Sequence, residues 1–433
     1  MNNSKLIHVI LEQNKHWPQG YQAERYINRE LLKQIKINSN FIEVITGVRR
    51  SGKSTIFRIL IDKLIKEKKI HNKEILFINF DHPIFIPFYK KVEKLDKIIE
   101  EAEVLNKSKI KYLFLDEIQN IYLWEKWIKA KYDEKCFKKI FITGSNSNLL
   151  SSQYTKRLSG RYFAHVNFPF SFPEYLTFLG KDFHLDYASN FSIKNELAHH
   201  FKKYLKFGGF PEFVREDDLE ILKSYYETII LKDCLDYNQI RDSLALKEVS
   251  YFLLNNVSSL YSYNKIGKYF NIHENTAKQY LENLKEAYLF LDLKKFDPSL
   301  KKQLINQKKI YCIDNGLVSS VGFGFFENHG PFLENFVAIE LSRRNKEYFY
   351  FKNKKECDFL IKENQAITQA IQVCWEINEG NRARELSGLI EAMDTFNLKQ
   401  GCIITFNHYE TIEKDNRKIN LIPGWLWALE NVK

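Results

Sequence analysis

The sequence predicts an α/β fold that opens with a parallel β-sheet and continues with a helical region and a second α/β region. Two observations predict the first sheet: short apolar runs alternate with amphipathic helical segments over the first 180 residues, and a glycine-rich motif follows the first run. Parallel strands are buried on both faces and are joined by crossover helices, which produces this alternation. The expected strands are Phe41–Thr46, Glu74–Phe80, Lys111–Leu115, Lys139–Thr143 and Phe163–Phe168.

Composition and charge narrow the class of protein. The chain has 433 residues, 44% of them hydrophobic, which is a globular composition long enough for two or three cores. The net charge of +11 favours an acidic partner such as DNA, or simply a basic surface. The six cysteines form no CxxC pair, which argues against a zinc ribbon and a secreted disulfide framework. Because no apolar run reaches ~18 residues, we expect a cytoplasmic protein without a membrane span.

The first functional motif is a nucleotide-binding loop. Gly47–Thr55 has the sequence GVRRSGKST and fits the pattern G-x-x-x-x-G-K-[ST]. It lies between an expected strand and an amphipathic helix, where loop amides and a helix N-terminus surround phosphates. We therefore expect ATP and Mg²⁺ as cofactors, with Lys53 at the β- and γ-phosphates and Ser54 on the metal. The expected nucleotide contacts are Gly47, Arg50, Ser51, Gly52, Lys53, Ser54 and Thr55.

Two carboxylates and a polar strand end complete the predicted catalytic site. Asp116 and Glu117 follow the strand Lys111–Leu115. A carboxylate at this position supports Mg²⁺, so Asp116 is predicted to be a metal residue and Glu117 to polarise the attacking water. The strand that is expected between them and the loop ends in Ser145 and Asn146. Asn146 is our choice to orient the water; Ser145 and a plain strand-end turn are the alternatives.

Two arginines follow that strand end, Arg157 and Arg161. Isolated arginines are usually solvated surface residues. An arginine just beyond this strand could instead act as an arginine finger, either in its own chain or toward a neighbouring subunit. We favour Arg161 for this role, and the second alternative would require a homo-oligomer.

Several segments together resemble one known family. They are Gly47–Thr55, Leu115–Gln119, Thr143–Asn146, Leu158–Arg161, Phe168–Tyr175, Gly208–Glu212 and Leu333–Val337. As a set they are similar to a group of prokaryotic AAA-type ATPases with a C-terminal winged-helix and PD-(D/E)XK-nuclease-like region. The resemblance covers nearly the whole chain. It implies a P-loop AAA-type parallel sheet, a helical and winged-helix region, a restriction-endonuclease-like α/β domain and ATPase activity, and it implies no pathway.

Four regions are expected along the chain. Residues 1–180 would form the AAA-type ATP-binding domain and residues 181–243 a helical lid or connector. Residues 244–325 would form the winged helix, and residues 326–433 the nuclease-like domain.

The expected winged helix carries polar and basic residues. Ser262 or Asn264 would begin one helix, and the helix Glu274–Lys285 would present Asn275, Lys278 and Gln279 outward, a pattern suited to DNA phosphates and base edges. The alternative is a module used only for packing or oligomerisation. The basic cluster expected around the wing strands, Leu289–Phe296 and Lys309–Ile313, consists of Lys294, Lys295, Lys301, Lys302, Lys308 and Lys309.

The C-terminal region follows the residue order of PD-(D/E)XK nucleases, with Glu334, Asp358 and then Gln372. Active members of that family carry Glu-x-Lys in the last strand, where Gln372 and Cys374 stand in this chain. A neutral amide and a thiol are poor substitutes for a metal-binding anion and a stabilising cation. Lys362 could replace the missing lysine, but we expect a nuclease-like fold that has lost catalysis.

Three functions are consistent with these motifs. The first is an ATPase that drives a DNA-associated or partner-binding C-terminal region. The second is a switch that binds ATP, hydrolyses it slowly, and controls contacts with DNA or a protein. The third is a metal-dependent nuclease regulated by ATP.

Overall fold

The computed structural model describes residues 3–18, 26–147, 158, 160–181, 191–236, 240, 242–322, 329–414 and 416–430. The chain forms two compact units, Met1–Asn167 and Phe168–Lys433. None of the described helices combines the length and the apolar character needed to cross a membrane. The finer boundaries expected at residues 180, 243 and 325 stay predictions.

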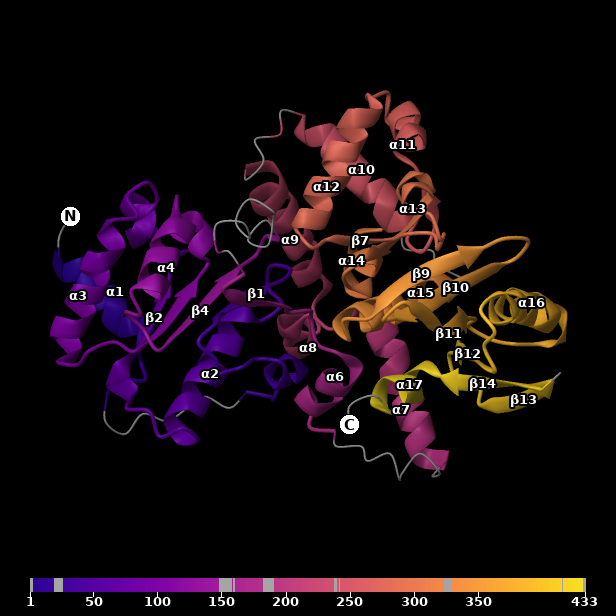
Figure 1. Cartoon of the computed structure of the whole chain (residues 1–433), viewed down its shortest axis with the longest axis horizontal. Helices are drawn as coiled ribbons and strands as arrows, with labels where there is room; N and C mark the ends of the chain where they lie inside the picture. Colours follow the sequence, from indigo (N-terminus) through magenta and orange to yellow (C-terminus); the bar gives the residue numbers. More distant parts are fainter. Residues whose placement is uncertain are drawn as a thin grey trace. The chain divides into compact units, whose positions relative to one another are not determined.

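A five-stranded parallel sheet forms the centre of the first unit (Figure 1). Its strands pair in the order β2-β3-β4-β1-β5, and every pair is parallel. All five strands that the sequence predicted are present, and their ends differ from the expected ones by at most two residues. The strands are β1 (Ile42–Thr46), β2 (Ile75–Asn79), β3 (Tyr112–Asp116), β4 (Lys139–Gly144) and β5 (Tyr162–Val166).

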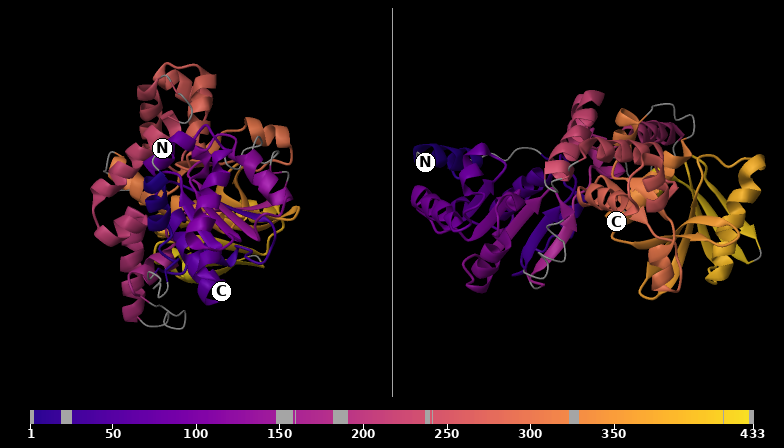
Figure 2. Two further views of the ribbon diagram at one scale, coloured as in Figure 1. Left: turned by 90° about the vertical axis from the view of Figure 1, so that its left-hand side faces the viewer. Right: turned by 90° about the horizontal axis from the view of Figure 1, so that it is seen from above.

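Helices cover both faces of this sheet (Figure 2). Alternate residues of a strand point to opposite faces, so Leu113 and Leu115 pack into one core and Tyr112 and Phe114 into the other. α1 (Asn3–Gln13), α3 (Lys94–Asn106) and α4 (Trp124–Asp133) build the first core, and α2 (Lys53–Lys66) builds the second. Short 3-10 turns are η1 (Glu30–Lys33), η2 (Asn72–Glu74), η3 (Pro83–Phe88) and η4 (Ile118–Asn120).

The second unit begins with helices and a small antiparallel sheet. Its first helices are α6 (Phe172–Phe178), α7 (Phe191–Phe207), α8 (Pro211–Glu216), α9 (Leu219–Thr228) and the π-helix η7 (Ile229–Asp236). There follow α10 (Ser243–Asn255), β6 (Leu260–Tyr261), α11 (Tyr263–Phe270), α12 (Glu274–Glu286), β7 (Phe290–Leu293), α13 (Leu300–Ile305), β8 (Lys308–Cys312) and α14 (Asn315–Val321). The strands pair in the order β6-β8-β7. Ser262 caps α11 by accepting from the Lys265 amide, whereas helix α13 between the two wing strands was not predicted.

A six-stranded mixed sheet follows, in the order β13-β14-β12-β11-β10-β9. α16 lies beside β11 and β12 (Figure 1). Three of its strands, β12, β13 and β14, follow α16 in the chain. The elements are α15 (Gly330–Arg343), β9 (Glu347–Lys352), β10 (Glu356–Glu363), β11 (Ala366–Val373), α16 (Glu379–Thr395), β12 (Gln400–Thr405), β13 (Glu410–Lys414), β14 (Arg417–Pro423) and α17 (Gly424–Glu430).

The Gly-Gly-Phe-Pro turn after α7 packs against two segments that are distant in the sequence. The Gly209 amide donates to Asp314 Oδ2 at 2.8 Å, and the Gly209 carbonyl accepts from the Phe170 amide at 2.7 Å. A Cβ atom at Gly209 would lie 2.3 Å from the Phe170 carbonyl oxygen, closer than real Cβ contacts. The turn therefore joins the segment that begins the second unit to α14, and only glycine fits between them.

We expect Gly209→Ala to lower the free energy of unfolding by about 1–3 kcal/mol or more, because a methyl group would have to displace a backbone carbonyl. Gly380→Ala is the matched control, since the nearest atom to its Cβ would be a side-chain oxygen at 3.4 Å. Denaturant unfolding of the two variants and the parent measures the difference. Equal unfolding midpoints for both variants would contradict the packing argument.

Candidate functional site

The predicted nucleotide residues meet at one edge of the parallel sheet. β3, β4 and β1 are neighbours in the sheet, and all three run in the same direction. The loop that follows Thr46, the turn that follows Gly144 and the carboxylate Asp116 at the end of β3 therefore lie at the same carboxyl edge. Ligands of open α/β sheets bind at this edge.

The loop that follows β1 is held tightly against the end of β5. A Cβ atom at Gly47 would lie 2.2 Å from the Asn167 carbonyl oxygen, and the φ of Gly47 is +138°. Asn167 also fixes the far side of the loop, because its Nδ2 donates to the Ser51 carbonyl at 2.9 Å and to the Ser51 hydroxyl at 3.1 Å. Arg50 adopts a positive φ of 68°. The loop is thus held in its curled shape by the backbone and the side chain of Asn167.

Lys53 begins α2 and points back into this loop. Its ammonium donates to the carbonyls of Gly47 at 3.1 Å and Val48 at 3.2 Å, and it lies 3.9 Å from Glu117 Oε1. The side chain is buried. A buried ammonium needs such partners, and anionic phosphate oxygens would suit it better than neutral carbonyls.

The two predicted metal residues are in direct contact. Ser54 Oγ donates to Asp116 Oδ2 at 2.6 Å, and the Thr143 hydroxyl donates to the other carboxylate oxygen. Burial raises the pKa of Asp116 to about 6; the Glu117 charge adds to this rise, and the two hydroxyl hydrogen bonds oppose it. A divalent cation beside these oxygens would favour the ionised carboxylate.

The side-chain oxygens at this site fit an Mg²⁺ ion that is held mainly by a phosphate ligand. Among the residues that the structure describes, no group of three or more His, Cys, Asp or Glu side chains is placed to hold a metal. Mg²⁺ commonly binds through one or two protein oxygens together with water and substrate phosphates. Ser54 and Asp116 can supply those protein oxygens, so the residues present fit the metal only when a phosphate ligand accompanies it.

Glu117 is turned toward Lys53 by an unusual backbone conformation. Its φ and ψ of 54° and 44° lie in the left-handed region, which costs a non-glycine residue about 1–3 kcal/mol. Gln119 Nε2 donates to Glu117 Oε2 at 2.5 Å, and the Glu117 amide donates to the Thr143 hydroxyl at 3.1 Å. Asn146 is buried at the end of β4, and its role in orienting water stays a prediction. The sequence motifs include Gln119 and Thr143 but assigned no role to them or to Asn167.

Arg161 lies at the opposite edge of the sheet. The Ile42 amide donates to its carbonyl at 3.0 Å, and β5 runs parallel to β1, so Arg161 stands beside the amino end of β1. Five residues of strand separate it from the loop, which is about 16 Å at 3.3 Å per residue. Its guanidinium pairs with Asp133 at 3.0 Å. A finger toward its own chain's loop is therefore wrong, whereas a finger toward a neighbouring subunit stays a prediction; Arg157 lies outside the described residues.

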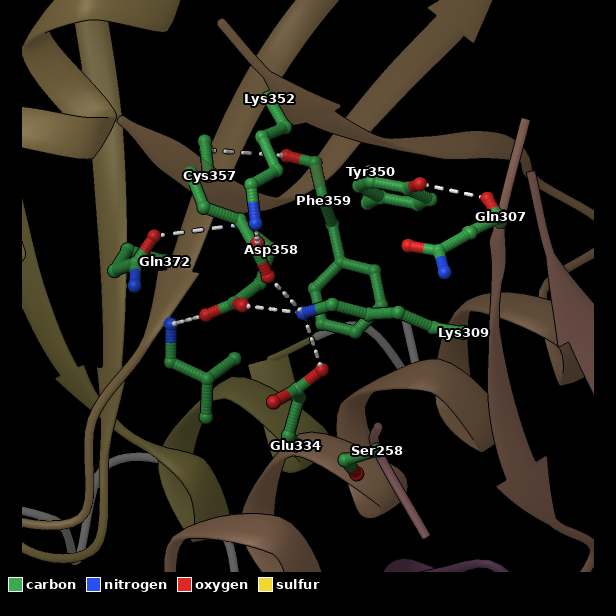
Figure 3. A network of polar contacts seen from close by, with 12 residues as sticks. Ser258, Gln307, Lys309, Glu334, Tyr350, Lys352, Cys357, Asp358, Phe359 and Gln372 are labelled. Atoms are coloured by element: carbon green, nitrogen blue, oxygen red, sulfur yellow. Dashed lines mark hydrogen bonds and ion pairs between the residues drawn. The ribbon is translucent and has the colours of Figure 1, made fainter. Parts of the chain in front are cut away.

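In the C-terminal sheet, the structure brings Glu334, Asp358 and Gln372 together from α15, β10 and β11 (Figure 3). Gln372 Oε1 accepts from the Asp358 amide at 3.3 Å, and its Nε2 donates to Glu385 Oε2 of α16 at 3.0 Å. The Val373 amide donates to Asp358 Oδ2 at 3.0 Å. The order of residues predicted from the sequence therefore corresponds to one buried polar cluster.

The cation of this cluster comes from β8, and it is Lys309. Its ammonium lies 2.9 Å from carboxylate oxygens of Glu334, Glu356 and Asp358, and its side chain is 4% exposed (Figure 3). Burial alone would lower the pKa of Lys309, but Asp358, Glu334 and the other acidic neighbours raise it well above its usual value. The ammonium therefore occupies the space between the carboxylates as a permanent positive charge.

Two expectations about lysines are wrong. Lys308 and Lys309 do not join a basic DNA-facing cluster: Lys308 pairs with Asp292 at 3.0 Å, and Lys309 is buried among carboxylates. Lys362 does not replace the missing lysine, because it pairs with Glu347 at 3.1 Å, and four residues of β10 separate it from Asp358, about 13 Å. Lys309 and Tyr311 lie on the same face of an expected strand. This spacing could have indicated from the sequence that Lys309 points inward.

The remaining groups of the cluster are also satisfied. Tyr311 donates to Glu334 Oε1 at 2.8 Å, and Lys352 pairs with Glu356 at 3.1 Å. Burial raises the pKa of Glu334 to about 7, while Lys309 opposes the rise. Cys374 directs its sulfur to the Glu376 carbonyl at 3.1 Å, and burial raises its pKa to about 11, so it stays a neutral thiol. The cluster is thus balanced by lysines and needs no metal ion.

Comparison with known proteins identifies the family. Residues 39–176 match the family model described as an AAA domain, and residues 198–327 match a domain of unknown function (DUF8612). Uncharacterized protein MJ1544 of Methanocaldococcus jannaschii is 35% identical over 94% of this chain and 91% of its own length. An uncharacterized protein of Haemophilus influenzae is 32% identical over 93% of this chain and 98% of its own length.

The chain belongs to the same family as these two proteins. Its first unit contains an AAA-type P-loop domain, because the matched residues include the loop, Asp116 and the strands between them. Among solved structures, Cdc6p from Pyrobaculum aerophilum covers 75% of this chain and 98% of its own chain at 11% identity with a TM-score of 0.28, which is too low to support an argument.

Replacing Lys309 tests the buried cluster. We expect Lys309→Met to lower the free energy of unfolding by about 3–5 kcal/mol, because it leaves buried carboxylates without their cation. The loss should be larger at pH 8 than at pH 5. In the variant the pKa of Glu334 in the folded state rises further above its unfolded value, because Lys309 no longer opposes the rise, so the folded protein takes up a proton and gains stability as the pH falls.

Two further variants complete this test, which is read by denaturant unfolding. Lys362→Met removes an exposed ion pair and should change stability by less than about 1 kcal/mol. Adding Glu334→Gln and Asp358→Asn to Lys309→Met should recover part of the lost free energy of unfolding, because two buried carboxylates without a cation are then removed. Equal stability of Lys309→Met and Lys362→Met would show that the cluster does not depend on the buried ammonium.

Proposed function

We propose that the first unit binds ATP with Mg²⁺ and hydrolyses it. The observation that carries this proposal is the 2.6 Å hydrogen bond between Ser54 of the P-loop helix and Asp116 at the end of β3. It brings together the two protein groups that Mg²⁺ requires, beside a buried Lys53 and a carboxylate that can act on water. The match of residues 39–176 to an AAA domain supports the same function.

Each residue of the site has one role in this proposal. Lys53 binds β- and γ-phosphate oxygens, and the curled loop offers amides to them. Ser54 and Asp116 hold Mg²⁺, which neutralises the charge on the phosphates when it is bound. Glu117 takes a proton from the attacking water, and Asn146 helps to orient that water. The left-handed backbone of Glu117 aims its carboxylate at the centre of the site.

Phosphates bound in the loop would compete for the contacts of Lys53. Lys53 now bonds two loop carbonyls and lies 3.9 Å from Glu117. Anionic phosphate oxygens would be better partners for this ammonium than the neutral carbonyls. The alternative is a switch that binds ATP at the same site and hydrolyses it slowly. The turnover rate separates an active ATPase from such a switch.

We also propose that residues 244–325 form a winged helix that associates with DNA or with a protein partner. The order of α10, β6, α11, α12, β7 and β8 supports it, and Asn275, Lys278 and Gln279 are exposed on α12. Lys301 and Lys302 are exposed on α13. Such a surface binds phosphates without regard to sequence. We also propose that the protein forms a homo-oligomer and is located in the cytoplasm.

For the C-terminal region we infer a restriction-endonuclease-like fold that has lost catalysis. Glu334, Asp358 and Gln372 keep the expected order and lie together, but Lys309 fills the space between the carboxylates. A metal ion would have to displace a buried, paired ammonium, which costs several kcal/mol. The region therefore contributes binding or structure, and phosphodiester cleavage is the less supported alternative.

The ATPase assignment is tested by separating binding from turnover. Lys53→Ala should raise the Kd for MgATP roughly 10- to 100-fold, because it removes hydrogen bonds to charged oxygens. Glu117→Gln should keep the affinity and lower turnover by a factor of about 10²–10⁴. Lys66→Ala, an exposed lysine on the same helix, is the matched control. Calorimetry and phosphate release supply the two readouts, and parent-like turnover in Glu117→Gln would show that another group is the base.

DNA association is tested with two charge-matched variants. Changing Lys294, Lys295, Lys301 and Lys302 to Gln should weaken binding uniformly across sequences and reduce the slope of log Kd against log salt by about 0.9 for each lost phosphate contact. Changing Lys354, Lys355, Lys399 and Lys418, all exposed, should have little effect. The DNA should stay intact with Mg²⁺ or Mn²⁺. Equal binding by both variants would favour a protein partner, and metal-dependent cleavage would refute the loss of catalysis.

A further inference from the structure

Arg49 of the P-loop reaches across the carboxyl edge of the sheet. Its Nη2 donates to Ser145 Oγ at 3.5 Å, and its Nη1 lies 4.0 Å from Asp81 Oδ2. Ser145 follows β4 and Asp81 follows β2, and these strands flank β3 in the sheet. The guanidinium therefore lies over the end of β3, the strand that carries the catalytic carboxylates.

Other arginines of the first unit with described contacts are directed elsewhere. Arg29 donates to the Ser51 carbonyl at 3.2 Å, and Arg58 donates to the Gln13 carbonyl at 2.9 Å. Arg161 pairs with Asp133 at the opposite edge. Arg49 differs from these three because it contacts side chains at the tips of two other strands, on the edge where the phosphates would bind.

The contacts of Arg49 suit a side chain that changes partners. Charge-assisted hydrogen bonds of guanidinium groups are usually about 2.7–2.9 Å long, and the distances from Arg49 to Ser145 and Asp81 are longer. Ser145 is a neutral acceptor, and the Asp81 carboxylate is half exposed, where ion pairs are weak. Arg49 itself is only 16% exposed. An anionic ligand at this edge would compete well for a guanidinium that is already nearly desolvated.

We propose that Arg49 is a catalytic arginine that acts on the γ-phosphate bound in its own chain. This proposal rests on the ATPase function proposed above. As the water oxygen bonds to the γ-phosphorus, Glu117 accepts the water proton, and the bond from phosphorus to the bridging oxygen of ADP breaks with its electron pair leaving on ADP. Arg49 donates hydrogen bonds to the γ-phosphate oxygens throughout and keeps its own protons, which stabilises the charge of the transition state.

A catalytic arginine within the P-loop makes a clear prediction about assembly. The loop wraps the phosphates with its backbone, and Arg49 precedes Lys53 by four positions, so the same chain supplies both residues to one site. Turnover per chain should therefore not depend on protein concentration. A finger from a neighbouring subunit, such as Arg161, would make turnover fall on dilution.

The experiment measures MgATP affinity and single-turnover hydrolysis of the full chain. We expect Arg49→Ala to lower the hydrolysis rate by a factor of about 10³ or more, with a Kd within about fivefold of the parent. Arg49→Lys should retain part of the activity, and added guanidinium ion at millimolar concentration should partly rescue Arg49→Ala. Asp81→Asn removes the carboxylate neighbour of Arg49 and should leave turnover unchanged or faster.

Each result decides between defined alternatives. If Asp81→Asn reproduces the loss and guanidinium gives no rescue, Arg49 only shapes the loop and the proposal is overturned. An equal loss of affinity and rate would make Arg49 a ground-state binding residue, which also overturns it. Mixing Arg49→Ala with Lys53→Ala chains should give no activity, because both residues serve one site; recovered activity would place the arginine in trans. A parent that fails to hydrolyse ATP would instead overturn the ATPase function itself.

Discussion

The direction of β1, β4 and β3 is the constraint on which the nucleotide site depends. Because the three strands are parallel neighbours, their carboxyl ends meet, and the P-loop, Thr143 and Asp116 come within hydrogen-bonding distance. The same constraint excludes residues at the amino ends of the strands. Arg161 comes after the turn that follows β4 in the sequence, but it lies a full strand length away from the P-loop. Strand direction, more than residue type, therefore decides which polar groups can take part in catalysis.

Buried charge imposes a second constraint, on the C-terminal sheet. Carboxylates from α15 and β10 cannot be buried together without a cation. In this chain a lysine from β8 supplies the charge, 25 residues before Glu334 and 49 before Asp358. One ion cluster thus ties the small antiparallel sheet to the C-terminal sheet and removes the need for a metal.

Sequence patterns predicted the strands, helices and loops that depend on local periodicity or spacing. The five strands of the first sheet and the helices α11 and α12 were found because each buries a regular face, and the P-loop was found because its glycines and lysine have fixed spacing. Contacts between distant segments were not predictable in this way. Lys309 looked like one of six wing lysines, since nothing within its own strand identifies the carboxylates that surround it. Thr143 and Asn167 are likewise defined only by the partners that strand pairing brings to them.

The direction of the strands also decides which contacts a bound nucleotide would affect. Lys53 is held by loop carbonyls, Arg49 by Ser145 and Asp81, and Glu117 by Gln119. The contacts of Arg49 join the P-loop to the tips of β4 and β2, whereas the carbonyl contacts of Lys53 stay within the P-loop and that of Glu117 stays within the turn after β3. A phosphate bound at this edge would compete for the Arg49 guanidinium, so it would act on the contacts that the P-loop makes with the tips of β2 and β4.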